Sequence, residues 1–288
     1  MASAPSFPHL PYKWRHGSLV RPRDFIRYYF PRLRGPRRCV LLWSAPVLRE
    51  LVEETGARPL GGLAGTFVVP PRARSVGVGL PRGIGAPATI SYCEELAALG
   101  AREFVGVGFA GALSSELAPG DLVVCDGAVR DEGTSHHYAP AHVAATPSPS
   151  LTAWVRGVLE SAGLPYREGP SWTTDAPYRE TRVELRRYRS EGVLTVDMEA
   201  SALFVFARAR RVRAASVFVI SDVLEESGWK PHFHRMRPRL AEITRALLRA
   251  GSTAPGGRAA RVGTARAGSR GAARPRSPRG AGRSRDRS

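Results

Sequence analysis

The sequence has few cysteines and no long apolar run. Cys39, Cys93 and Cys125 lie far apart, without the paired spacing of a zinc site or a disulfide framework. The adjacent His136 and His137 have no third ligand at zinc-like spacing. Nothing approaches the roughly 18 consecutive apolar residues of a membrane-spanning helix, and the Pro-rich N-terminus is not typical of a signal peptide. We therefore expect a protein of the reducing cytoplasm, with no metal and no membrane contact.

Basic charge is abundant, but it is concentrated at the two ends of the chain. The net charge is +18, of which residues 1–38 carry +8 and residues 251–288 carry +9, so residues 39–250 carry only +1. Almost all of it is arginine, and the C-terminal segment has almost no apolar side chain to bury. We predict that residues 251–288 form a disordered tail. The alternative role for this tail is weak, salt-sensitive contact with nucleic acid through the phosphates.

The region between the two basic ends has the pattern of an α/β domain. Apolar runs typical of strands alternate there with helical segments, which predicts a mostly parallel sheet with helices on both faces. We expect a single-domain three-layer α/β/α sandwich at 39–250, preceded by a basic Pro/Arg-rich arm at 1–38. Strands are predicted at 39–43, 75–80, 104–109, 121–129, 192–196 and 214–220, and helices at 47–56, 87–99, 150–161, 198–210 and 237–250.

Two carboxylates follow predicted strands late in this region. Glu199 lies where a strand ending at Val196 turns into a helix of small residues, and Asp222 follows the apolar run that ends at Ile220. In an open α/β sheet the carboxyl ends of the strands form one ligand-binding edge. A helix N-terminus there favours an anion or a hydroxyl-rich ligand. The two acids are predicted to share one cleft; the alternative is that each merely caps a helix.

Two glycine motifs have the form of dinucleotide-binding fingerprints but lack their context. Residues 83–88 fit G-x-G-x-x-A, and residues 106–111 fit G-x-G-x-x-G. In a dinucleotide-binding site the strand after the first motif ends in an Asp or Glu that binds a ribose hydroxyl, whereas here the next predicted strand ends at Phe109. The second motif is followed by a segment too short and too rich in Pro and Gly for a helix that binds pyrophosphate. A dinucleotide cofactor is therefore not expected.

Together these motifs resemble the nucleoside phosphorylase family, which includes uridine phosphorylase, bacterial purine nucleoside phosphorylase and related nucleosidases. The resemblance extends from about Gly77 to Trp229, with overall motifs nearest the uridine phosphorylase branch. The motifs occur in the family's order, at Gly83-Ile84-Gly85-Ala86-Pro87, Phe104 to Gly111, Pro119-Gly120-Asp121, Val129 to Tyr138, Asp197-Met198-Glu199-Ala200 and Ser221-Asp222.

The resemblance implies a role for each candidate site residue. Glu199 would bind the ribose hydroxyls and oppose the positive charge that builds on the sugar as the glycosidic bond breaks. Met198 would form an apolar wall for the sugar. Asp222 would protonate or hydrogen-bond the departing base, which requires a raised pKa. The implied contacts of the base are Ala110, Gly111, Tyr178, Val196 and Asp222.

The family's phosphate site is poorly matched. Its Arg and its Ser or Thr fall at Gly106 and Phe109. Arg49, one place out of register with the family's early Arg, is our candidate phosphate ligand, with Arg82 and Arg130 as alternatives. Three functions stay open: phosphorolysis of a purine or pyrimidine nucleoside, hydrolysis with water in place of phosphate, and nucleoside binding without turnover. The first would use phosphate as a co-substrate and no cofactor.

The resemblance also bears on the base and on assembly. The residues with which uridine phosphorylase contacts the pyrimidine edge fall at Thr181 and Val183, whereas Ser221-Asp222 is purine-like, so we expect a preference for purines. Members of the family share active sites between subunits, which implies a homo-oligomer, for instance a dimer-based hexamer. A histidine of the N-terminal arm, His9 or His16, would then complete a neighbour's site.

Overall fold

The computed structural model describes residues 12–60, 65–71 and 75–252. The predicted tail, apart from its first two residues, and His9 lie outside these ranges. The strands are β1 (Arg38–Leu42), β2 (Arg58–Leu60), β3 (Gly65–Val69), β4 (Val76–Pro81), β5 (Glu103–Ala112), β6 (Leu122–Asp131), β7 (Arg167–Thr174), β8 (Thr195–Asp197), β9 (Arg213–Glu225) and β10 (Gly228–Pro231). The helices are α1 (Pro22–Tyr29), α2 (Ala45–Thr55), α3 (Ala86–Ala98), α4 (Pro149–Ser161), α5 (Arg182–Ser190), α6 (Ala200–Arg210) and α7 (Phe233–Ser252), with short 3₁₀ turns η1 (Lys13–Arg15), η2 (Thr134–His137) and η3 (Pro177–Arg179).

The strands form one 10-stranded sheet in the order β10-β9-β6-β7-β8-β5-β1-β4-β3-β2. Because β5 also pairs with β9, the strands β9, β6, β7, β8 and β5 close into a ring. The central pairs β1–β4, β1–β5 and β5–β9 are parallel. The pairs β6–β9 and β5–β8 and the edge strands β2, β3 and β10 are antiparallel. The pairs β6–β7 and β7–β8 are also parallel. The predicted α/β class is confirmed, and the sheet is mixed because antiparallel pairs, those of the edge strands and those of β6 with β9 and β5 with β8, join its parallel core.

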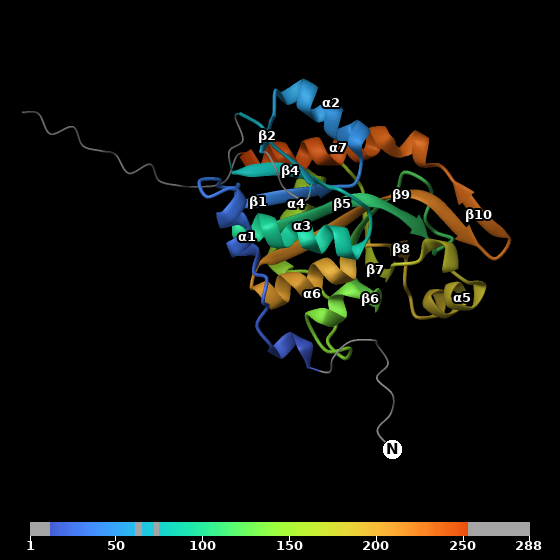
Figure 1. The fold of residues 1–288 in the computed structure, drawn as a ribbon. Coiled ribbons are helices and arrows are strands. Elements are labelled where there is room, and N and C mark those ends of the chain that lie inside the picture. Colours follow the sequence, from blue (N-terminus) through green and yellow to red (C-terminus); the bar gives the residue numbers. More distant parts are fainter. Residues whose placement is uncertain (1–11, 61–64, 72–74, 253–288) are drawn as a thin grey trace, which may run out of the picture. The chain divides into compact units, whose positions relative to one another are not determined.

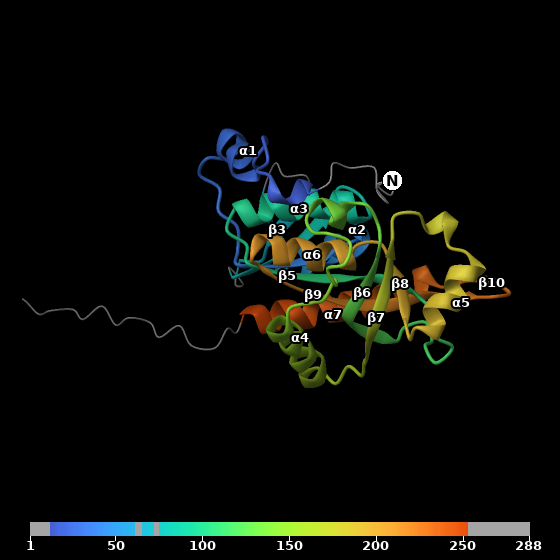
Figure 2. The ribbon, with the colours of Figure 1, turned by 90° about the horizontal axis from the view of Figure 1, so that it is seen from below.

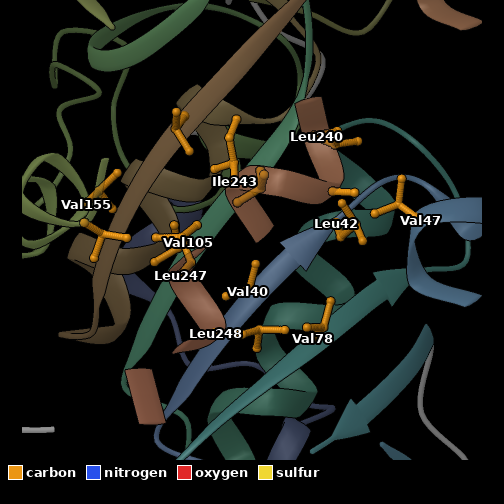
Figure 3. Packing of buried hydrophobic residues seen from close by; sticks show 14 of the residues in the cluster. Val40, Leu42, Val47, Val78, Val105, Val155, Leu240, Ile243, Leu247 and Leu248 are labelled. Atoms are coloured by element: carbon orange, nitrogen blue, oxygen red, sulfur yellow. The ribbon is translucent and has the colours of Figure 1, made fainter. Parts of the chain in front are cut away.

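Helices cover both faces of the sheet, which confirms the three-layer arrangement (Figures 1 and 2). Side chains of α2, α4 and α7 pack on one face against Val40, Val78 and Val105 (Figure 3). Side chains of α3 and α6 pack on the other face, where Cys39 and Leu41 point. Adjacent residues of β1 thus enter opposite cores, which explains why a strand buried on both faces has a continuous apolar sequence.

The N-terminal segment adds a helix, α1, to the layer that contains α3 and α6. Within the predicted arm, α1 packs against α3 and buries Ile26, which is 6% exposed. Among the described residues, no helix combines the length and the apolar character needed to cross a lipid bilayer.

Candidate active site

The turn from β8 into α6 is held by Asp197, which is 5% exposed. Its Oδ1 accepts hydrogen bonds from the hydroxyls of Ser171 and Thr173, both at 2.8 Å. Its Oδ2 accepts from the backbone N–H groups of Glu199 at 2.8 Å and Ala200 at 2.6 Å. Burial raises the pKa of Asp197, while these hydrogen bonds act in the opposite direction. Asp197 therefore satisfies the first amides of the helix and fixes the backbone of Glu199.

Glu199 is half-buried and reaches the loop between β4 and α3. Its Oε1 accepts a hydrogen bond from the backbone N–H of Gly85 at 2.6 Å. Gly85 has a φ of 88°, a conformation that favours glycine. A Cβ at this glycine would lie 3.7 Å from the Cε of Met198. Burial, and after it the charge of Asp197, raises the pKa of Glu199 to about 8. The structure thus places Met198 and Glu199 together beside the glycine loop.

The predicted base contacts meet where β5, β8 and β9 come together. Gly111 pairs with Val196 of β8 and with Asp222 of β9, and Ala110 precedes it on β5. A Cβ at Gly111 would lie 3.0 Å from both Val196 Cγ1 and Asp222 Oδ2, and 2.7 Å from Leu224 Cδ1. The structure therefore brings these residues together around a position that has room only for a hydrogen atom.

This close packing predicts that Gly111→Ala is destabilising. We expect the added methyl to lower the free energy of unfolding by about 1–3 kcal/mol and to displace Asp222. Gly127→Ala on β6 is the matched control, because the nearest atoms to its Cβ lie 4.0 Å away. Urea unfolding of the two variants measures the difference. Equal stability of both variants would contradict the packing described for Gly111.

Asp222 is 7% exposed, and each of its oxygens already accepts a hydrogen bond. Oδ1 accepts from the hydroxyl of Ser221 at 2.6 Å, and Oδ2 accepts from the indole N–H of Trp229 at 2.7 Å. A second carboxylate, Glu180, lies nearby, just before α5. Burial, and then the charge of Asp222, raises the pKa of Glu180 to about 7. No sequence pattern singles out Glu180, because it stands in a polar stretch far from Asp222 along the chain.

Two predicted contacts lie apart from this group. Tyr178 in η3 has a 100% exposed side chain. Arg49 lies on the exposed side of α2 and has no hydrogen bond or ion pair from its side chain among the described residues. The roles proposed for both stay predictions.

The alternative phosphate ligand Arg130 is already committed to its own loop. Its Nε donates to the Ser135 hydroxyl at 2.8 Å, and its other N–H groups donate to the carbonyls of Pro140, Val143 and Ala139. The guanidinium therefore holds the segment around η2 in place. Four of its five N–H groups are hydrogen-bonded within the protein, which argues against a role in phosphate binding.

Aromatic side chains lie at the positions that match the family's phosphate ligands. A Cβ at Gly106 would lie 3.4 Å from the Trp43 ring, and a Cβ at Gly108 would lie 3.1 Å from it. Phe109 packs edge-on against Phe233, with ring centroids 5.9 Å apart. Besides these rings, the Ser216 hydroxyl lies 2.8 Å from a Cβ at Gly106, so this part of β5 is lined by aromatic groups and one hydroxyl.

A cavity of about 660 Å³ opens between the N-terminal segment, α3 and η2, and neither Glu199 nor Asp222 lines it. Asp175 and Pro87 line it, and Asp175 is one of the charges that raise the pKa of Glu199. Lys13 and His16 line it from the N-terminal segment of the same chain. Among the described residues, no group of three or more His, Cys, Asp or Glu is arranged to hold a metal ion.

Residues 60–249 match the family model described as the phosphorylase superfamily. The chain belongs to the phosphorylase superfamily. This superfamily member is 31% identical over 148 residues to guanosine phosphorylase of Halorubrum lacusprofundi, covering 51% of this chain and 61% of the relative. It is 32% identical over 149 residues to uridine phosphorylase of Treponema pallidum, covering 48% and 58%. The chain thus spans about 60% of the length of these curated relatives.

The fold is also that of a solved structure. AMP nucleosidase from Bacteroides thetaiotaomicron superposes with a TM-score of 0.65 at 22% identity, over 79% of this chain and 97% of that chain. At this identity the likeness concerns the fold alone. The family and the α/β fold predicted from the motifs are confirmed.

Proposed function

We propose that this phosphorylase-superfamily member cleaves the N-glycosidic bond of a nucleoside, with phosphate as the nucleophile. The observation that carries the proposal is that the strands carrying or preceding the two acids both pair with Gly111 of β5. Glu199 follows β8 and is held at the head of α6 by Asp197 and Gly85, and Asp222 is the partner of Gly111 in β9. The relatives named guanosine phosphorylase and uridine phosphorylase support the same chemistry.

Glu199 is proposed to bind the sugar. Ribose hydroxyls would donate hydrogen bonds to its carboxylate, and the positive charge that develops on the ring would be opposed by it. Both interactions favour the ionised form. Burial raises the pKa of Glu199 to about 8, and hydrogen bonds donated by the sugar would act in the opposite direction. Met198, in contact range of the glycine loop, would provide the apolar wall.

Purine nucleosides are the proposed substrates. Thr181 matches a position at which uridine phosphorylase contacts the pyrimidine. Here its hydroxyl caps α5 by accepting a hydrogen bond from the Glu184 N–H at 3.3 Å. Val183, at the second such position, is 74% exposed. The polar group nearest to Gly111 is the Asp222 carboxyl, which could contact a purine N–H group or protonate a ring nitrogen. No cofactor enters this scheme, and a homo-oligomeric assembly belongs to the same proposal.

Hydrolysis is the second candidate function. The packing of Trp43 and Phe109 at the positions that match the family's phosphate ligands favours water as the nucleophile. Phosphorolysis would instead place phosphate near Arg82, which is exposed in the loop after β4, or near Arg49 at the start of α2. Both arginines follow parallel strands whose carboxyl ends meet at the edge that holds Glu199.

Base release with and without phosphate tests these alternatives. The full chain is incubated with guanosine, inosine, adenosine and uridine in phosphate-free buffer and in buffer with added phosphate. We expect free base and ribose 1-phosphate only with phosphate, and faster release from the purine nucleosides. Equal release without phosphate, with free ribose as the product, would identify a hydrolase. Absence of cleavage for every nucleoside under both conditions would refute the proposed activity.

A further inference from the structure

The side chain of Trp229 combines an exposed ring with a hydrogen bond to a buried group. Trp229 lies in β10 and is 61% exposed. Its indole Nε1–H nevertheless donates to Oδ2 of Asp222 at 2.7 Å, and Asp222 is only 7% exposed. An exposed indole N–H can bond to water, so Trp229 does not need this contact to satisfy its donor. The consequence of the contact falls on Asp222.

The position of the Trp229 ring is fixed by the β9–β10 hairpin and by α7. Trp229 pairs with Leu224 of β9 in the antiparallel ladder. Its ring centroid lies 6.2 Å from that of Phe233 at the start of α7, and the Phe233 centroid lies 5.9 Å from that of Phe109. These spacings are within the range of favourable aromatic pairs. The row of three rings therefore connects β10 to β5, the strand that contains Gly111.

Together with Ser221, Trp229 holds the Asp222 carboxyl at both oxygens. The Ser221 hydroxyl donates to Oδ1 at 2.6 Å, on the side opposite to the indole contact with Oδ2. Rotation of the carboxyl about its Cβ–Cγ bond would break both hydrogen bonds. Oδ2 is also the oxygen that would lie 3.0 Å from a Cβ at Gly111. Trp229 therefore helps to set where Oδ2 lies relative to β5.

Within the part of the chain that the structure describes, no second donor reaches Oδ2 of Asp222. Removal of the indole N–H would therefore leave this oxygen without a donor from the protein. Cations on the neighbouring β10 and α5 have other partners: Lys230 binds Glu225 at 2.7 Å, Arg186 binds Glu226 at 2.6 Å, and Arg182 and Arg189 donate to backbone carbonyls.

We propose that Trp229 is a positioning residue for Asp222. The inference rests on the proposed glycosidic cleavage, in which the Asp222 carboxyl contacts the departing purine. A group that acts on the base in the transition state must be held within about 0.5 Å of its productive position. Without the indole N–H the carboxyl can turn toward water, and it then spends less time in that position. Trp229 thus affects turnover through Asp222, without a contact of its own to the substrate.

Two replacements of Trp229 test the role of the N–H group. Trp229→Phe removes the donor and keeps an aromatic ring beside Phe233. We expect kcat on guanosine to fall about tenfold and KM to change less than about twofold, because no contact with the substrate is lost. Benzothienylalanine at position 229, with sulfur in place of the N–H and both fused rings kept, should show the same loss without a change in packing.

Trp154→Phe on α4 is the matched control. Its indole N–H makes no hydrogen bond to another residue that the structure describes, and its ring packs against the Arg38 guanidinium, 3.8 Å from the ring centroid. This variant should keep the wild-type kcat and KM on guanosine. Melting temperatures of all variants show whether each protein is folded under the assay conditions.

A double-mutant cycle with Asp222→Ala separates positioning from packing. In that background Trp229 has no carboxyl to orient, so Trp229→Phe should change kcat, measured at raised protein concentration, by less than about twofold. An equal tenfold loss in both backgrounds, a loss confined to KM, or an unchanged kcat in either Trp229 variant would overturn the assignment and leave the cleavage activity standing. Wild-type kcat in Asp222→Ala would overturn it as well, because no carboxyl contact would then be needed. A wild-type protein that cleaves no nucleoside would refute the proposed function itself.

Discussion

Glu199→Gln is expected to lower kcat on the preferred nucleoside at least about 100-fold. The amide keeps the size of the side chain but cannot carry the negative charge that opposes the ribose cation in the transition state. Steady-state kinetics on guanosine and inosine measure the loss. Glu53→Gln, an exposed acid of α2, is the control and should match the wild-type rate. Near wild-type turnover in Glu199→Gln would remove Glu199 from the mechanism.

The same substitution should flatten the acid side of the pH profile. In the free protein the pKa of Glu199 is raised to about 8, so the ionised fraction increases tenfold per pH unit well below that value. We therefore expect kcat/KM of the wild type to rise between pH 5 and pH 7. In Glu199→Gln this rise should be absent.

Although Glu199→Gln should lower activity, it should not lower the stability of the folded protein at high pH. Because the pKa of Glu199 is raised in the folded protein, the carboxyl contributes stability in full below its ordinary pKa, and this contribution is lost as the pH rises through about 8. Glu199→Gln removes that loss, so its melting temperature should equal or exceed that of the wild type at pH 9. A variant that melts at lower temperature at every pH would indicate a structural role instead.

Asp197→Ala is expected to impair both folding and activity. It would leave the amides of Glu199 and Ala200 without their side-chain acceptor and remove the partner of the Ser171 and Thr173 hydroxyls. We expect the free energy of unfolding to fall by about 2–4 kcal/mol. Turnover should drop more than about tenfold, because the backbone of Glu199 loses its anchor.

Asp197→Asn separates hydrogen bonding from charge at the same position. Its carbonyl oxygen can still accept from the two amides, and its NH₂ can donate to the Ser171 and Thr173 hydroxyls, which can rotate to accept. We expect less than half the loss of stability seen in Asp197→Ala, measured by urea unfolding. Equal losses in the two variants would show that the negative charge, and not the hydrogen bonds, holds the turn.

Much of the fold follows from local sequence patterns. The apolar runs at 39–43 and 214–220 lie within β1 and β9 or differ from them by one residue at an end, and α2 ends at Thr55 with Gly56 as its C-cap, as the glycine predicts. Strand β7 has no such pattern, because Gly169 and Pro170 interrupt it. It forms because both its neighbours, β6 and β8, provide hydrogen-bonding edges.

Helix α5 illustrates why other elements escape prediction. Its sequence is dominated by arginine, and only Leu185 and Tyr188 are buried. A capping box between Thr181 and Glu184 starts the helix, but contacts with the β9–β10 hairpin hold it in place. Those contacts join residues about 40 positions apart, which no local periodicity encodes.

The sequence by itself determined the α/β class, the resemblance to the phosphorylase family and the two acids Glu199 and Asp222, because buried strands, helix ends and motif order are written in neighbouring residues. Only the tertiary structure decided that the charge of Asp222 acts on Glu180, that Arg130 is hydrogen-bonded within its own loop, and that Trp43 covers Gly106 and Gly108 of β5. Such contacts depend on strand register and on how the ring of strands closes, and these are settled by the packing of the whole domain.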